Sequence, residues 1–128
     1  MDAADAGGRR MSAAAVSVLA FGIYLVALGT GLLLAPNVLL ALFGRPPTSE
    51  PWLRVVGLVA LVLGTYYVAA GRAEVTAFFG WTVKGRLFGA AVMAVLVAKG
   101  IAPAFVLLMA AGDAAGAAWT AIASRRAG

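Results

Sequence analysis

The stretch that decides the fold is Met11–Gly44, MSAAAVSVLAFGIYLVALGTGLLLAPNVLLALFG, which contains no Asp, Glu, Lys or Arg. This apolar segment is longer than the roughly 20 residues that an α-helix needs to cross the hydrocarbon core of a bilayer. Water penalises exposure of such a surface, whereas hydrocarbon accepts it. The segment therefore predicts a transmembrane helix at about 12–35, which ends before Pro36 because proline cannot continue a helix.

The composition of the whole chain agrees with a membrane protein. Of the 128 residues, 63% are hydrophobic and 12% are charged, against about 45–50% and 25% in soluble domains. A soluble domain of this size needs a polar surface that this chain cannot supply. The sequence predicts an all-α, polytopic membrane protein, a four-transmembrane-helix bundle within the lipid bilayer.

The later apolar runs place the other three transmembrane helices. Residues 37–43 are expected to form a short interfacial turn of helix, and 44–51 a loop that contains three of the five prolines. The second, third and fourth transmembrane helices are predicted at about 52–70, 77–98 and 104–123.

The third helix is the least regular, because its continuous apolar run is too short to span a bilayer alone. We expect it to extend backwards through Lys84 and Arg86, with a re-entrant segment as the alternative. The transmembrane domain then covers 12–124, between a polar tail at 1–11 and a basic tail at 125–128.

Positive charges beside the apolar runs predict the orientation in the membrane. Four helices place both termini on one side, and the side that carries more Lys and Arg is usually cytoplasmic. The side of the termini holds Arg9, Arg10, Arg72, Arg125 and Arg126, against Arg45 and Lys99 on the other. We expect cytoplasmic termini, and the richness in Ala, Gly and Arg favours a bacterial inner (plasma) membrane.

Composition also excludes several functions. The net charge is +5, but the basic residues flank apolar runs and do not cluster with aromatics, so nucleic-acid binding is not expected. The chain has no Cys and no His, which removes thiol relays, His- or Cys-ligated metals and a Ser-His-Asp triad. No catalytic residue, metal or cofactor is predicted. An enzyme acting on an apolar membrane substrate is the remote alternative.

The two charges deepest in the predicted helices are Arg86 and Asp113. Counted from the turn between their antiparallel helices, they lie about 20 Å and about 15 Å along the axis at 1.5 Å per residue. We expect a buried pair between them. One interpretation is a structural clamp that neutralises both charges and fixes the helix register. The other is a proton or cation relay centred on Asp113, since intramembrane charges are often functional.

Glycine patterns predict where helices approach closely. Two small-xxx-small motifs accompany the two deep charges, and such motifs let helix backbones pack in contact. They are Gly85-x-x-x-Gly89 and Gly112-x-x-x-Gly116. The first and second helices carry a different pattern, two glycines seven residues apart, which keeps each pair on one packing stripe. These are Gly22 with Gly29, and Gly57 with Gly64.

Four further charges are expected at the membrane interfaces. Arg54, one turn into the second helix, is expected to pair with Glu50, with an anionic lipid as the alternative partner. Glu74 is expected to pair with Arg72 or Lys84. The Lys84 side chain is expected to extend to the cytoplasmic interface, with ligand binding as the alternative.

Three short motifs carry a family resemblance. They are Ala35-Pro36-Asn37 at a helix end, Arg45-Pro46-Pro47 in a loop, and Trp52–Gly57 (WLRVVG) at a helix start. In these motifs and in overall layout the chain resembles small four-helix membrane proteins of bacteria of the DoxX-like type. The resemblance implies an inner-membrane accessory protein and supplies no catalytic residue. Small multidrug transporters are similar in size, but their first helix carries an acidic residue that this chain lacks.

Two functions follow as hypotheses. The first is a non-enzymatic accessory or scaffold subunit that packs against a membrane-protein partner, as minimal loops and abundant small residues favour. The second is a small oligomeric transporter or channel, a homo-oligomer in which Arg86 and Asp113 line the path.

Overall fold

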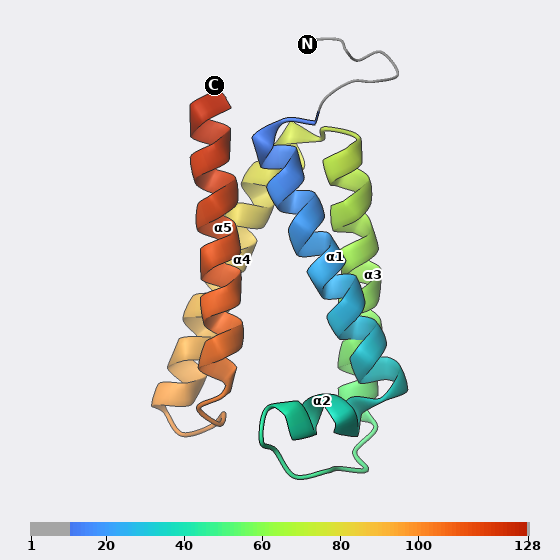
Figure 1. The fold of residues 1–128 in the computed structure, drawn as a ribbon. Helices are drawn as coiled ribbons and strands as arrows, with labels where there is room; N and C mark the ends of the chain where they lie inside the picture. Colours follow the sequence, from blue (N-terminus) through green and yellow to red (C-terminus); the bar gives the residue numbers. More distant parts are fainter. Residues whose placement is uncertain (1–10, 128) are drawn as a thin grey trace. The chain divides into compact units, whose positions relative to one another are not determined.

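The computed structural model describes residues 11–127, which form five α-helices and no strand (Figure 1). The helices are α1 (Ala13–Leu34), α2 (Pro36–Leu42), α3 (Trp52–Arg72), α4 (Thr76–Ala98) and α5 (Val106–Ala127). All but α2 are long and apolar enough to cross a membrane. This confirms the predicted all-α fold class with four membrane-length helices. The predicted polar tail at 1–11 lies, except for its last residue, outside the described residues.

Local chemistry sets the helix ends close to the predicted positions. Ala35 separates α1 from α2 with φ −144° and ψ 63°, and Pro36 opens α2, where the missing proline N–H costs no helical hydrogen bond. The expected interfacial turn is therefore a helix of its own. Helix α4 is continuous through Lys84 and Arg86, which confirms the extension and argues against a re-entrant segment.

The basic C-terminal tail is the boundary that the sequence misplaced. Helix α5 continues to Ala127, so Arg125 and Arg126 lie on its last turn. Cations there interact favourably with the partial negative charge of the terminal carbonyl groups. That interaction is a physical reason for the helix to continue through two residues that the hydropathy pattern excludes.

The chain divides into two compact units. One contains residues 19–69, which include most of α1, all of α2 and most of α3; we call it the α1/α3 unit. The other contains residues 11–18 and 70–127, which bring the first turns of α1 together with α4 and α5; we call it the α4/α5 unit. Each unit has its own way of packing its helices.

In the α1/α3 unit the two long helices touch through glycine backbones. A Cβ built on Gly22 would lie 2.9 Å from the carbonyl oxygen of Gly64, and a Cβ on Gly29 would lie 2.5 Å from that of Gly57. Gly29 follows Gly22 by seven residues and Gly57 precedes Gly64 by seven, so both contacts belong to one antiparallel register. The packing role predicted for both glycine pairs is confirmed. Close backbone approach gains van der Waals contact, which drives helix association in lipid.

Replacement of Gly29 by Ala should therefore destabilise the α1/α3 unit. The added methyl would overlap the backbone nitrogen of Leu61 and lie 2.5 Å from the Gly57 oxygen, so the helices must separate. Overpacking of this kind costs about 1–3 kcal/mol. Thermal unfolding of the purified protein in mild detergent, followed by circular dichroism, should show a lower Tm.

Gly31→Ala in the same helix is the matched control. Its methyl would meet only the side chain of Leu39, 2.9 Å away at Cδ1, which can turn aside. The two variants should differ clearly in Tm; equal values would contradict the glycine contact.

Candidate functional site

Arg86 is buried in the α4/α5 unit, with 4% of its surface exposed. Its Nε donates to the Thr82 carbonyl oxygen at 3.2 Å, and its Nη2 donates to Thr82 Oγ1 at 3.0 Å and to Thr120 Oγ1 at 2.9 Å. A guanidinium stays charged in proteins, so its hydrogen bonds must replace those of water. Two threonine hydroxyls, one from α4 and one from α5, do part of that work.

The hydrogen bonds continue from Arg86 to the start of α1. Thr120 Oγ1 lies 2.7 Å from Ser17 Oγ, which donates to the Ala14 carbonyl oxygen at 2.7 Å. Ser17 and Thr120 are almost completely buried. We call Ser17, Thr82, Arg86 and Thr120 the arginine network. It connects α1, α4 and α5 through polar groups in a region where each unsatisfied group would be costly.

Asp113 lies one step further along the same helix pair. Its Oδ2 is 3.8 Å from the position of a Cβ on Gly89. Thr82 and Thr120 both accept a hydrogen bond from Arg86 Nη2. Gly89 follows Thr82 by seven residues and Asp113 precedes Thr120 by seven, so the Gly89–Asp113 contact belongs to the same antiparallel register. The hydrogen bonds above direct the Arg86 guanidinium toward Thr82 and Thr120. A direct ion pair between Arg86 and Asp113 stays a prediction.

Two glycines of the small-xxx-small motifs, Gly85 on α4 and Gly112 on α5, do not form the close approach that the sequence predicts. Within the described residues, a Cβ on Gly85 or on Gly112 would have nothing within 4 Å. Gly89 faces the Asp113 carboxylate, and Gly116 is half-buried. The prediction is therefore wrong for Gly85 and Gly112. Both glycines are exposed, whereas the buried Arg86 and Thr120 occupy the side on which α4 and α5 meet.

Glu74 makes a long-range cap on α1. Its Oε2 accepts a hydrogen bond from the Ser12 backbone N–H at 2.6 Å, and its Oε1 accepts one from Ser12 Oγ at 2.9 Å. Ser12 Oγ in turn accepts from the Ala15 N–H at 3.0 Å, as an N-cap side chain does. A capping box normally takes its carboxylate from the third helical residue; here it comes from the α3–α4 connection.

Among the described residues, Glu74 has no ion pair with Arg72 or Lys84, so the pairing predicted from the sequence is wrong. The orphan N–H groups at the start of α1 attract the carboxylate instead. Glu74 adopts φ 54°, a left-handed conformation that is uncommon for residues other than glycine. Lys84 lies exposed on α4.

Arg54 also has a different partner from the one predicted. Its Nη1 donates to the Leu33 carbonyl oxygen at 2.5 Å, and residues 11–127 contain no ion pair between Arg54 and Glu50. Leu33 belongs to the last turn of α1, whose carbonyl groups lack intrahelical donors. The arginine satisfies one of them, while the Glu50 backbone N–H donates to Thr48 Oγ1 at 3.1 Å.

A pocket of about 400 Å³, with both polar and apolar lining residues, lies where three helix ends of the α4/α5 unit meet. The start of α1, the start of α4 and the end of α5 contribute, together with the α3–α4 connection (Figure 1). We call it the interfacial pocket; its lining is Ser12, Ala14, Glu74, Thr76, Phe79, Gly80 and Ser124. One lining residue is bonded to the arginine network: Thr82 Oγ1 donates to the carbonyl oxygen of Phe79 at 3.0 Å.

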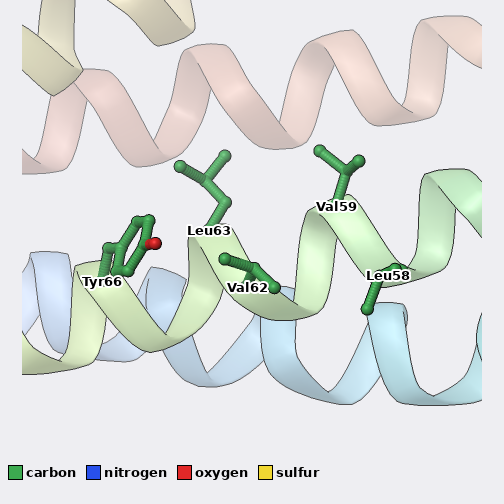
Figure 2. Close-up of a pocket in the computed structure, with 5 residues that line it drawn as sticks. All are labelled: Leu58, Val59, Val62, Leu63 and Tyr66. Carbon is green, nitrogen blue, oxygen red and sulfur yellow. The ribbon is translucent and has the colours of Figure 1, made fainter.

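A second hollow, of about 370 Å³, is lined by α3 alone (Figure 2). Four aliphatic side chains and one tyrosine line it, and no charged group is among them: Leu58, Val59, Val62, Leu63 and Tyr66. An apolar surface of this kind suits hydrocarbon and offers no group that would fix a polar ligand.

No three His, Cys, Asp or Glu side chains gather into a potential metal site within residues 11–127. Comparison with known protein families, with characterised proteins and with solved structures finds no match for this chain. The fold and the buried polar groups therefore define its class on their own: a multi-pass α-helical membrane protein with a polar network inside one helix unit.

The sequence identifies Arg86 and Glu74 as charges that need partners but does not reveal the hydroxyl groups that bind them. Two signals were available. Thr82 stands four residues before Arg86, on the same helix face, and Ser12 stands at the N-cap position of the first apolar run. Thr120 gave no such signal, because its contact with Arg86 depends on how α4 and α5 are aligned.

Replacement of Thr120 by Val should destabilise the protein by about 1–3 kcal/mol, because it removes an acceptor from a buried guanidinium and a partner from Ser17. The side chain keeps its size and remains compatible with a helix. Thermal unfolding in detergent measures the loss.

Thr120→Ser is the matched control, since it keeps the hydroxyl and removes only a methyl group. It should lose clearly less stability than Thr120→Val. A larger loss for the serine variant would mean that packing, and not the hydrogen bonds, is what Thr120 contributes.

Proposed function

We propose that this chain is a non-enzymatic accessory or scaffold subunit that packs against a helix of a partner protein in the membrane. The observation that carries the proposal is an exposed face of small residues on α5. Ala111, Gly112, Ala115 and Ala118 lie within two turns of that helix and are all exposed. We call them the α5 small-residue face. Helix interfaces in membranes are enriched in such residues, because they let backbones approach closely.

The two other glycine surfaces support this interpretation by contrast. In the α1/α3 unit the glycine backbones are already in contact with one another. On α4, Gly85 is open but stands between Trp81 and Phe88, which are 68% and 71% exposed. Those two large side chains keep another helix backbone away from Gly85. On α5 the exposed large side chains Leu108 and Trp119 lie before and after the small residues, so about two turns of small residues stay open between them.

A small oligomeric transporter is the second candidate, and a different observation favours it. Polar groups continue from Glu74 and Ser124 at the helix ends to Thr120, Arg86 and Asp113 deeper along α4 and α5. Intramembrane charges often mark the paths of ions or protons. The polar groups stop near Asp113, and the remainder of both helices toward their connecting turn is apolar as far as Lys99.

For the location, we propose the inner membrane of a bacterium with both termini in the cytoplasm. The support is the distribution of Lys and Arg beside the four apolar helices together with the positive-inside rule. The resemblance to DoxX-like proteins supports the same membrane and an accessory role.

Single-cysteine labelling should establish the orientation cleanly, because the natural chain has no cysteine. Ser49 and Ala73 are exposed residues in the two polar connections on opposite sides of the predicted bundle. A membrane-impermeant maleimide added to intact spheroplasts should label the Ser49→Cys variant and leave the Ala73→Cys variant unlabelled until the cells are lysed. The opposite pattern would reverse the proposed orientation.

Purification from native membranes in mild detergent tests the accessory role. We expect a larger membrane protein to co-purify in fixed stoichiometry, as measured by mass spectrometry. Gly112→Leu should lower its recovery at least tenfold. A leucine there has open space in this chain and is compatible with lipid, so folding should be unaffected.

Gly85→Leu is the matched control, since it adds the same side chain to an open glycine of the neighbouring helix and should keep the partner. A homo-oligomer without a larger partner would contradict the accessory role and favour transport. Equal loss in both variants would contradict the α5 small-residue face as the contact.

A further inference from the structure

We propose that the interfacial pocket binds a primary ammonium group, with the carboxylate of Glu74 as its counter-ion. The ligand class that presents this group at the membrane surface is an aminophospholipid of the phosphatidylethanolamine type. This inference goes beyond the accessory role and does not depend on it.

The carboxylate is held in place before any ligand arrives. Its two oxygens each accept one hydrogen bond from Ser12, at 2.6 and 2.9 Å. A carboxylate offers about four acceptor positions, so about two remain for a ligand. Because the side chain is already ordered, binding loses little further side-chain entropy at this residue.

The rest of the lining matches a donor with three N–H bonds. Thr76 and Ser124, which each carry a hydroxyl group, line the pocket together with Glu74. A primary ammonium donates three hydrogen bonds, whereas a quaternary ammonium donates none and is usually held by several aromatic rings. Phe79 is the one aromatic side chain among the lining residues. The pocket should therefore prefer a primary amine to choline.

The position of the pocket suits a lipid headgroup. All of its lining residues lie within about one and a half turns of the ends of membrane-length helices, where headgroups meet the hydrocarbon. Its volume of about 400 Å³ falls within the range of small-molecule sites. Arg125 and Arg126 follow the lining residue Ser124 directly on α5. Arginine binds phosphate well, so they can serve the phosphodiester beside the ammonium group.

The test is lipid binding by the full chain, delipidated in detergent and measured by native mass spectrometry and by thermal shift. The probes are phosphatidylethanolamine and phosphatidylcholine with the same acyl chains, which differ only in methylation of the amine. Phosphatidylethanolamine should bind at least tenfold more tightly. Equal binding of the two lipids would overturn the proposal.

Three variants distinguish a role of Glu74 in ligand binding from a purely structural role. Glu74→Gln removes the charge and should abolish most of the preference for the primary amine. Thr120→Val lies outside the pocket lining, so it should lower stability and retain the preference. Gly80→Leu fills the pocket from a position where a Cβ meets nothing within 4 Å, and it should abolish binding in a folded protein. Retained preference in Glu74→Gln or Gly80→Leu would also overturn the proposal.

Soluble phosphoethanolamine identifies the source of the ammonium group. If it displaces the lipid at millimolar concentration, the pocket recognises the headgroup alone and accepts a free amine. If it does not, the acyl chains contribute and the ligand is a membrane lipid. In both cases the ammonium preference of the unmodified protein must be present for the proposal to stand.

Discussion

The structure depends on one constraint, the absence of water from the hydrocarbon core of a bilayer. Each backbone N–H and C=O in that region must find a partner within the chain, and helices meet the requirement locally. The same constraint applies to side chains. Arg86 carries a charge that it cannot lose, and it is buried with its guanidinium bonded to Thr82 and Thr120. Polar contacts are consequently concentrated around this residue, and α4 and α5 are aligned by them.

The two helix units pack their helices in different ways. In the α1/α3 unit, glycines at matching heptad positions bring the backbones into direct contact, and van der Waals attraction holds the helices together. In the α4/α5 unit, side chains of the arginine network fill the space between the helices, and glycine contacts are absent at Gly85 and Gly112. A chain with so many small residues therefore retains open small positions on α5, where we propose the partner contact.

Within the α4/α5 unit, the side-chain hydrogen bonds are gathered at one end. Glu74 caps the start of α1, the interfacial pocket lies beside this cap, and the arginine network begins one turn deeper. The negative charge of Glu74 lies at the helix ends, and the positive charge of Arg86 lies deeper along α4. This arrangement fits recognition of a polar headgroup at the surface better than chemistry at depth, because the deep charge is already engaged by hydroxyl groups.

The sequence by itself determined the fold class, the number of membrane-length helices and most of their ends, because hydropathy, proline and helix capping act locally. It also identified Arg86, Asp113 and Glu74 as residues that need partners, since charge in an apolar segment is costly wherever the segment lies. Only the tertiary structure decided which residues are the partners of Arg86 and Glu74. Ser12 and Glu74 are 62 residues apart, and Thr120 follows Arg86 by 34. Such contacts depend on the register of helices in space, and a hydroxyl or a glycine carries no local signal of what will face it across that distance.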